Sequence, residues 1–407
     1  MLNLSKLTKN YFFLLLFSPL LSYYTLSFFD LSSQFYLGIV VLFIGVIYIM
    51  FSKKIKIPNY AWWLLLFIIY SFLFNVGNDV SIFTCLTRLF KSPQTHVFFA
   101  LIVINNCTFD DRFVKRVIPL IKFTVIVAAI VSVIQVIKIG FFDATDIWER
   151  GQIHESEVIG SIYLTYRESI FSFVDPNEQG LSFIPLLSVL AGFLLKNKSR
   201  WLIVFLILGG ITAILSNSRY IMIAFLLILF QLIVLHRVNL KSIFKYLISS
   251  IIIVLVLYQI LIYFGYNFNT WYQERLFAEG AITETTRYKA IDNFLFFFPK
   301  FYLFGSGGMT DDIRDASNAI GSSQIHVGYL CGLVYFGIIG AFFLFGFWFQ
   351  LTKHLYKNAK RTKYWGAFFA FLVFLSANLS LVKFHVFFYG ILFALIFDKY
   401  YSDKYAT

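Results

Sequence analysis

The chain has 407 residues and a net charge of +13, yet only 14% of its residues are charged while 59% are hydrophobic. A soluble protein of this length could not cover its surface with so few charges, so the composition excludes an ordinary water-soluble globular protein. Aromatic residues make up 21% of the chain, which is typical of lipid-facing helices and interfacial belts. We therefore expect an all-α, polytopic integral membrane protein.

Runs of about 17–25 mostly apolar residues are long enough to cross a bilayer as helices. Taken in chain order, these runs predict about twelve spans, near residues 11–29, 35–51, 61–76, 80–104, 117–138, 178–195, 201–215, 219–235, 246–265, 325–351, 364–382 and 385–397. The first run has no small-residue cleavage site and another span follows it at once, so we interpret it as a retained helix and not as a signal peptide. No internal repeat at a fixed period is evident.

The fourth predicted span is interrupted by Arg88, Lys91 and Pro93. We expect it to be broken or re-entrant, an arrangement that membranes tolerate only where protein or water covers the backbone. Charged residues within a membrane segment commonly mark a functional site. We therefore count Arg88 among the residues that bind substrate.

The loops between these spans alternate sharply in charge. One side holds 21 of the 34 basic residues beside only four acids, Asp110, Asp111, Asp398 and Asp403. Cytoplasmic loops of membrane proteins carry an excess of Lys and Arg, so this side is predicted to be cytoplasmic, with both termini inside. The positive net charge then follows from topology and does not indicate a nucleic-acid partner.

Two outer segments, residues 140–177 and 266–324, are too long to be simple connections within the single membrane domain that we expect over residues 1–407. Basic residues are expected mainly on the cytoplasmic side. Six arginines nevertheless lie outside or at the outer membrane edge: Arg150, Arg167, Arg219, Arg275, Arg287 and Arg314. Arginine keeps its charge and grips phosphate or carboxylate with a planar fork of donors. Pairing with neighbouring glutamates explains single arginines but not all six.

Arg219 and His326 are the most informative of the outer polar residues. Ser216-Asn217-Ser218-Arg219 is a tight polar turn between two apolar spans, and it puts a permanent charge near the outer interface. Such a charge usually faces a cavity, with snorkelling to the interface as the alternative. His326 opens the tenth span, where a structural role is the alternative to acid–base chemistry.

The remaining patterns carry weaker signals. The run Gly305-Ser306-Gly307-Gly308 matches neither a Walker loop nor a dinucleotide fingerprint. It favours a flexible turn with positive φ angles, with an anion-binding nest as the alternative. The three cysteines have no metal-ligand spacing and are predicted to be buried small apolar residues. The pair Asp311-Asp312 lacks a third ligand, so we expect neither a required metal nor a cofactor.

Several of these residues together resemble the O-antigen polymerase/ligase superfamily. That superfamily has a pattern of an arginine, a proline, an "FGxG"-like turn and a histidine. This sequence is similar to the pattern in Thr286-Arg287-Tyr288-Lys289-Ala290, Pro299, the turn 304–307, and His326 before the glycine-containing helix 328–340. Ser216–Arg219 resembles its "SR" turn, and Arg167 followed by 175–180 resembles its first-loop "R…PN…G" pattern. One departure is Val327, where relatives often have Asn, which leaves a hydrogen-bonding role at that position in doubt.

The resemblance implies a GT-C-like membrane fold and a lipid-linked glycan transferase of the bacterial inner (cytoplasmic) membrane, with its active site facing the periplasm. Its donor and acceptor are undecaprenyl-pyrophosphate-linked oligosaccharides, held among membrane lipids, and a chain-length regulator is a further partner that it suggests. A polymerase moves the growing glycan onto a new lipid-linked repeat unit, whereas a ligase moves it onto lipid A core. We favour the polymerase, acting without a metal and with inversion at the sugar C1.

A catalytic hypothesis assigns roles to these residues. Stabilising the charge on the departing pyrophosphate is expected to supply most of the rate. Arg219 and Arg287 clamp the donor pyrophosphate, and Arg167 and Arg314 assist. His326 orients or deprotonates the acceptor hydroxyl. Asn177 and Glu178 are assigned to substrate binding, and Glu178 and Asp175 are the runners-up as the base.

Two alternatives belong to other classes of protein. A flippase or transporter also can have twelve helices, and Arg88 with Lys91 is the feature that best supports it. It would be expected to show repeat symmetry and charges buried at the bilayer midplane, which this sequence does not. A purely structural membrane scaffold does not explain the arginine bias.

Overall fold

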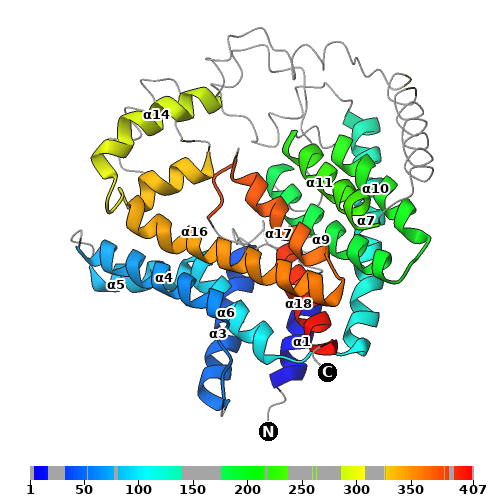
Figure 1. Cartoon of the computed structure of the whole chain (residues 1–407), viewed down its shortest axis with the longest axis horizontal. Coiled ribbons are helices and arrows are strands. Elements are labelled where there is room, and N and C mark those ends of the chain that lie inside the picture. Colours follow the sequence, from blue (N-terminus) through cyan, green and yellow to red (C-terminus); the bar gives the residue numbers. More distant parts are fainter. Residues whose placement is uncertain are drawn as a thin grey trace.

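The computed structural model of the chain describes residues 4–16, 33–52, 54–77, 81–139, 176–215, 219–236, 286–307, 327–379, 381–384 and 389–405, with the single residues 259, 263 and 325. For residues 33–37, 134–139, 176–179, 215, 219, 232–234, 236 and 286–289 it describes the backbone alone. Over these ranges the chain forms thirteen helices and no strand, which confirms the all-α class (Figure 1).

The helices follow the predicted spans closely where both are described. In chain order they are α1 (Leu4–Leu15), α3 (Ser33–Phe51), α4 (Asn59–Gly77), α5 (Ile82–Lys91), α6 (Pro93–Asn106), α7 (Asp111–Ile139), α9 (Pro176–Lys196), α10 (Trp201–Leu215), α11 (Arg219–His236), α14 (Thr286–Phe301), α16 (Gly328–Thr362), α17 (Gly366–Ala377) and α18 (Tyr389–Lys404). The span predicted at 246–265 and most of the one at 11–29 lie outside the described residues.

The fourth predicted span is broken, as expected. Helix α5 starts at an N-cap formed by Ser81, whose hydroxyl accepts the Thr84 N–H, and it ends before Ser92. Pro93 then opens α6 at the first helical position, where its missing N–H is not needed. Arg88 and Lys91 lie in the last turn of α5, where a positive charge is favoured by the helix dipole.

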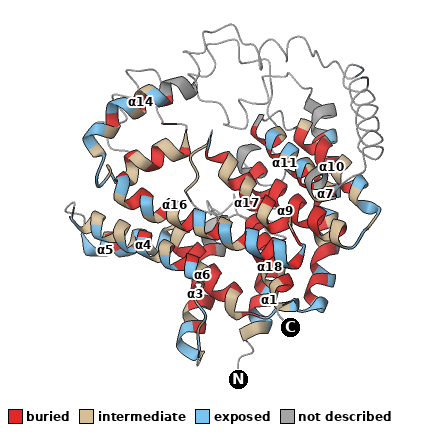
Figure 2. Cartoon of the chain, viewed as in Figure 1, coloured by how far each residue is buried: buried red, intermediate tan, exposed pale blue. Residues whose placement is uncertain are grey.

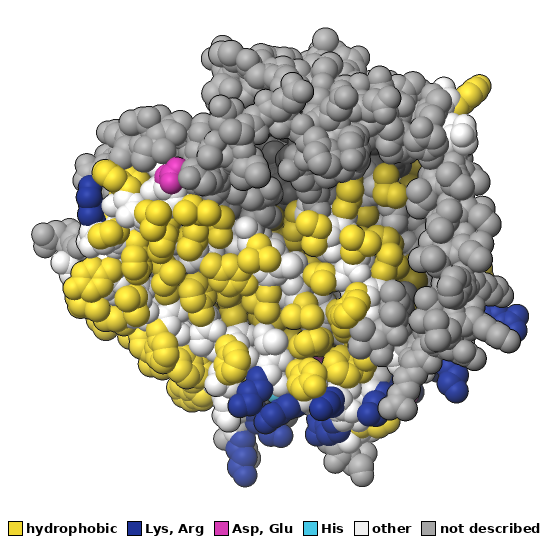
Figure 3. All heavy atoms as spheres, turned by 45° about the horizontal axis from the view of Figure 1, so that its top comes forward, with side chains coloured by type: hydrophobic (Ala, Val, Ile, Leu, Met, Phe, Trp, Pro, Cys, Tyr) yellow, Lys and Arg dark blue, Asp and Glu magenta, His cyan; other side chains and the backbone are white. Residues whose placement is uncertain are grey.

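The surface is that of a membrane protein. Three helical stretches are long and apolar enough to cross a bilayer, Asn59–Gly77, Asp111–Val133 and Gly328–Thr362, and five shorter apolar helices accompany them in the described part. On the face that Figure 3 shows, a broad band of apolar side chains covers the described part, and Lys and Arg side chains gather below it at the lower edge. The count of twelve spans, the GT-C-like fold and the identity of the membrane remain predictions.

Helix α9 lies at the centre of one half of the molecule. It contacts α7, α10, α11, α17 and α18, and its residues from Gly180 to Ala191 are buried. Helices α17 and α18 are also buried on nearly all sides (Figure 2). The other half is built on α16, which packs along α4 and carries α14, while α3 packs on α6.

Both ends of the chain lie at the same edge of the molecule (Figure 1). There the Lys9 ammonium is 3.3 Å from the Asp110 carboxylate, and the Lys404 ammonium donates to Asp111 over 3.0 Å. These pairs tie α1 and α18 to the start of α7. The two ends therefore lie on the same side, as the topology predicts, and the assignment of that side to the cytoplasm stays a prediction.

Candidate active site

The predicted site residues fall at the beginnings of helices. Arg219 is the first residue of α11 and Arg287 the second of α14, while Asn177 and Glu178 are the second and third of α9. A helix start is a favourable place for anions because its first N–H groups have no partner within the helix. The side chains of these four residues lie outside the described part of the structure, so their mutual distances stay predictions.

The other predicted residues are placed less fully. Arg167, Asp175, Arg314 and His326 lie outside the described residues. Arg88 is described in full: its guanidinium is exposed and donates from Nη1 to the Asn75 Oδ1 over 3.1 Å.

The neighbours of Arg287 and His326 lie in one small core. Ala290, one turn after Arg287, and Ile325, which directly precedes His326, are both buried, at 0% and 2% exposure. They share a cluster with Phe297, Cys331 and Val334. The structure therefore brings the start of α14 and the residues before α16 into one packed unit, although 38 positions separate Arg287 from Ile325 in the sequence.

Helix α16 is interrupted at Gly337, which has φ 62° and ψ −176°. In a continuous α-helix the Ile338 N–H would donate to the Val334 carbonyl and the Ile339 N–H to the Tyr335 carbonyl. The break separates these two pairs, which leaves four backbone groups without their helical partners. Unpaired backbone groups are unfavourable in a membrane, so each requires another partner.

The turn after α14 supplies all four partners. Ser306 N–H donates to Val334 O and Gly307 N–H to Tyr335 O, both over 2.9 Å. In return the Ile338 N–H donates to Tyr302 O over 2.8 Å, and the Ile339 N–H donates to Leu303 O over 3.3 Å. We call this pairing of residues 302–307 with the α16 break the interlock.

A tyrosine from a third helix closes the interlock. The Tyr70 hydroxyl on α4 lies 2.6 Å from Phe304 O and 3.0 Å from Phe336 O, one carbonyl on each side of the pairing. A Cβ atom added at Gly305 would lie 2.3 Å from Tyr335 O, and one added at Gly337 would lie 2.3 Å from Leu303 O. Both positions therefore need glycine for space as well as for their positive φ.

The interlock decides between the two interpretations of the glycine-rich turn. Gly305 and Gly307 have φ angles of 79° and 74°, which confirms a turn with positive φ. The N–H groups of Gly305, Ser306 and Gly307 all donate to backbone carbonyls, so they do not form an anion nest. The turn is held by backbone hydrogen bonds and is a structural support for α14 and α16.

Sequence reasoning missed Tyr70 and the helical state of residues 286–301. Tyr70 lies in an apolar span that gives no local sign of a polar partner more than 230 positions away. Helix α14 carries Arg287, Lys289 and Asp292 among its apolar residues, so it does not resemble a membrane span.

The prediction of buried cysteines is confirmed for Cys85, Cys107 and Cys331. Within the described ranges no cluster of three or more His, Cys, Asp or Glu could hold a metal ion.

A comparison with protein families covers this region. Residues 202–345 match the family model described as O-antigen ligase. This part of the chain is similar to an O-antigen ligase domain. The match runs from α10 through α11 and α14 into α16, so it includes Arg219, Arg287, His326 and both sides of the interlock. It confirms the resemblance to the O-antigen polymerase/ligase superfamily.

The O-antigen ligase family consists of glycosyltransferase-like enzymes, and the family implies lipid-linked glycan substrates. The match covers about a third of the chain, and Arg88, Arg167, Asn177 and Glu178 precede it. No curated protein matches the sequence.

Proposed function

We propose that the protein polymerises lipid-linked oligosaccharide repeat units, moving a growing glycan from undecaprenyl pyrophosphate onto a new lipid-linked unit at the periplasmic face. The main support is the common core that holds Ala290 and Ile325, which lie near Arg287 and His326 in the sequence. A charge clamp and a base must be held close together to act on one bond, and Ala290 and Ile325 belong to one buried cluster. The family domain spans this same region.

The proposed reaction is a direct displacement at the sugar C1. An acceptor hydroxyl oxygen attacks C1 of the donor sugar, and the bond from C1 to the pyrophosphate oxygen breaks, so the electron pair leaves with the pyrophosphate. Arg219 and Arg287 neutralise that leaving group, with Arg167 and Arg314 assisting. His326 accepts the hydroxyl proton. One displacement inverts C1, and the chain needs no metal for it.

The charge of the predicted outer arginines, and their predicted placement at the membrane surface, agree with these substrates. A pyrophosphate with an isoprenoid tail places its anion at the bilayer surface and its hydrocarbon inside. The arginines predicted at the outer edge suit that anion, and arginine binds it at any physiological pH because its guanidinium does not titrate.

A ligase is the second candidate, because the matching family is described as O-antigen ligase. The two reactions share a donor and differ in the acceptor. Purified protein in liposomes that hold lipid-linked repeat units alone separates them. Longer glycans on the lipid carrier indicate a polymerase, whereas growth that requires added lipid A core indicates a ligase. A flippase would move the unit across the bilayer without lengthening the glycan.

Substitutions at the site test the mechanism. We expect Arg287→Ala and His326→Ala to reduce glycan transfer by about 10²–10³-fold, the usual effect of removing one charge-stabilising group or base. Arg287→Lys keeps the charge but loses the two-point fork, and we expect an intermediate rate. Arg116→Ala removes an exposed arginine from α7 near the opposite end and is the matched control. Normal glycan ladders from both site variants, at normal protein levels, would exclude these residues from the site.

A further inference from the structure

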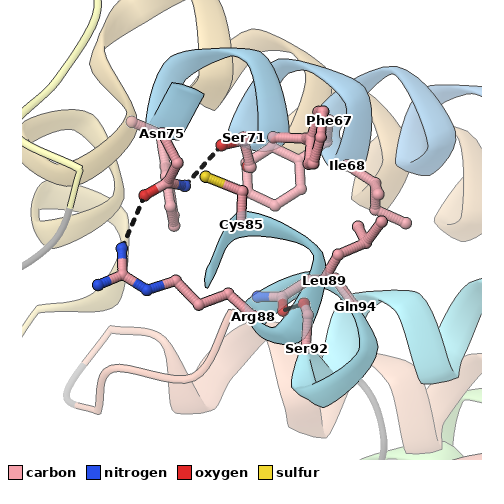
Figure 4. A pocket seen from close by; sticks show the side chains of 11 residues that line it. Phe67, Ile68, Ser71, Asn75, Cys85, Arg88, Leu89, Ser92 and Gln94 are labelled. Atoms are coloured by element: carbon pink, nitrogen blue, oxygen red, sulfur yellow. Dashed lines mark hydrogen bonds between the residues drawn. The ribbon is translucent and has the colours of Figure 1, made fainter. Parts of the chain in front are cut away.

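A pocket lies beside the interlock, and none of the catalytic residues proposed above is among its lining residues. It has a volume of about 190 Å³ and lies between α4, α5, the start of α6 and the break in α16 (Figure 4). Its lining residues are Phe67, Ile68, Ser71, Phe72, Asn75, Cys85, Arg88, Leu89, Ser92, Gln94 and Phe336. On the predicted topology it opens near the outer end of α4.

One side of this pocket can bind an anion. The Arg88 guanidinium is exposed, and among the described residues no carboxylate lies within ion-pair distance of it; its one described partner is the neutral Asn75 amide. Asn75 in turn donates to Ser71 O over 2.6 Å, which holds the amide oxygen toward Arg88. The Ser71 hydroxyl lines the pocket, is buried, and has no hydrogen-bond partner among the residues that the structure describes. A ligand with acceptor oxygens would satisfy both groups.

The start of α6 adds to the preference for an anion. Ser92 and Gln94 line the pocket at the point where Pro93 opens this helix. The first N–H groups of a helix have no carbonyl partner within it and carry a partial positive charge. A phosphate is the anion that best suits a guanidinium fork together with helix N–H groups.

The other side of the pocket is apolar. Phe67, Ile68, Leu89 and Phe336 form its wall. Helix α5 also exposes Ile82, Phe83, Leu86 and Phe90, with Phe83 at 79% exposure. A short helix that exposes large apolar side chains beside Arg88 and Lys91 is suited to the interface of a membrane with anionic lipids. Free inorganic phosphate would leave the apolar wall without a partner.

We propose that this pocket binds the phosphate of a membrane lipid, with Arg88 as its cation and the hydrocarbon tail against Phe67, Leu89 and α5. The proposal goes beyond glycan transfer and does not depend on it. The site contacts the interlock, because Phe336 lines the pocket while its carbonyl accepts the Tyr70 hydroxyl. A lipid held here therefore lies against the support of α14 and α16.

The test measures lipid binding by the purified full-length protein, independently of any transfer activity. Detergent-solubilised protein is titrated with phosphatidylglycerol, phosphatidylcholine or undecaprenyl phosphate, and retained lipids are counted by native mass spectrometry. We expect one saturable site for a lipid with an accessible anionic phosphate, and about tenfold weaker binding for Arg88→Gln, which corresponds to about 1.4 kcal/mol. Ser71→Leu, which fills the pocket without changing charge, is expected to reduce occupancy similarly.

Lys91→Gln is the matched control, because Lys91 is exposed on the same helix but does not line the pocket. Equal losses from Arg88→Gln and Lys91→Gln would mean general attraction of α5 to anionic lipid and would overturn the proposal. Unchanged binding in Arg88→Gln and Ser71→Leu, with normal melting temperatures, would overturn it as well. Competition separates the sources: displacement of phosphatidylglycerol by equimolar undecaprenyl phosphate supports a carrier-lipid site, and its retention supports a phospholipid site.

Discussion

Gly337→Ala tests whether the interlock supports the fold and the site. The backbone at Gly337, with φ 62° and ψ −176°, is one that only glycine adopts readily, so alanine adds about 1–3 kcal/mol of strain. Its Cβ would also lie 2.3 Å from Leu303 O and 2.5 Å from Gly305 N, which are backbone atoms that cannot rotate away.

Relief of that clash requires residues 302–307 to move off α16. The four backbone hydrogen bonds of the interlock would then weaken or break, at about 1 kcal/mol each. About 1–3 kcal/mol of strain and about 2–4 kcal/mol from the weakened or broken hydrogen bonds give an expected loss of stability of about 3–7 kcal/mol. Because α14 would lose its support, we also expect glycan transfer to fall by more than the folded fraction does.

The assay compares thermal unfolding in detergent with glycan transfer per folded molecule. Gly77→Ala is the control, since a Cβ there meets nothing within 4 Å and the residue ends α4. Tyr70→Phe removes only the hydroxyl that bridges the two carbonyls, and we expect a loss of about 1 kcal/mol. If Gly337→Ala melted and reacted like Gly77→Ala, the interlock would not support α14 and α16 as argued.

Further predictions concern the end of the molecule that carries both chain ends. Asp110→Ala removes the carboxylate that accepts the Phe113 N–H at the start of α7, and should cost about 1 kcal/mol by thermal unfolding at neutral pH. That hydrogen bond, helped by Lys9, holds the pKa of Asp110 below its ordinary value, so its stabilisation is present above about pH 4 and is lost as pH falls through the lower folded pKa. Asp398→Ala leaves the Asn358 amide, 2.8 Å away, without its buried acceptor, and we expect a loss of about 1–3 kcal/mol. Asp403→Ala, which breaks only the partly exposed pair with Lys399, should change stability by less than about 0.5 kcal/mol in the same assay. An alkaline phosphatase fused after the last residue should be inactive and a fused green fluorescent protein bright; the reverse pattern would contradict a cytoplasmic C-terminus.

Most helix positions could be predicted from the sequence. Apolar runs predicted α10 and α11 almost to the residue, because a bilayer demands long uninterrupted apolar stretches that few other structures contain. The break before α6 was also predictable, because Arg88, Lys91 and Pro93 interrupt an apolar run. Helix α14 was not, because it packs against α16 through only part of its surface and carries charges elsewhere.

The candidate site was predictable only as a set of residues. Arg219, Arg287 and His326 stand out because charges next to apolar spans are costly and therefore need a reason. Whether they converge depends on which helices pack together, and this is a property of long-range contacts. The common core of Ala290 and Ile325 has no local sequence signal, since both are ordinary small or apolar residues in their own segments.

The sequence by itself determined that this chain is a helical membrane protein, where most helices lie, and which residues resemble the O-antigen polymerase/ligase superfamily. These follow from local quantities: hydropathy, charge and short motifs. Only the tertiary structure decided that the glycine-rich turn pairs with a broken α16, that Tyr70 closes this pairing, and that Arg88 faces a pocket. Each of these depends on backbone groups or side chains that meet across tens to hundreds of residues, where packing and hydrogen-bond satisfaction in the folded chain select the partner.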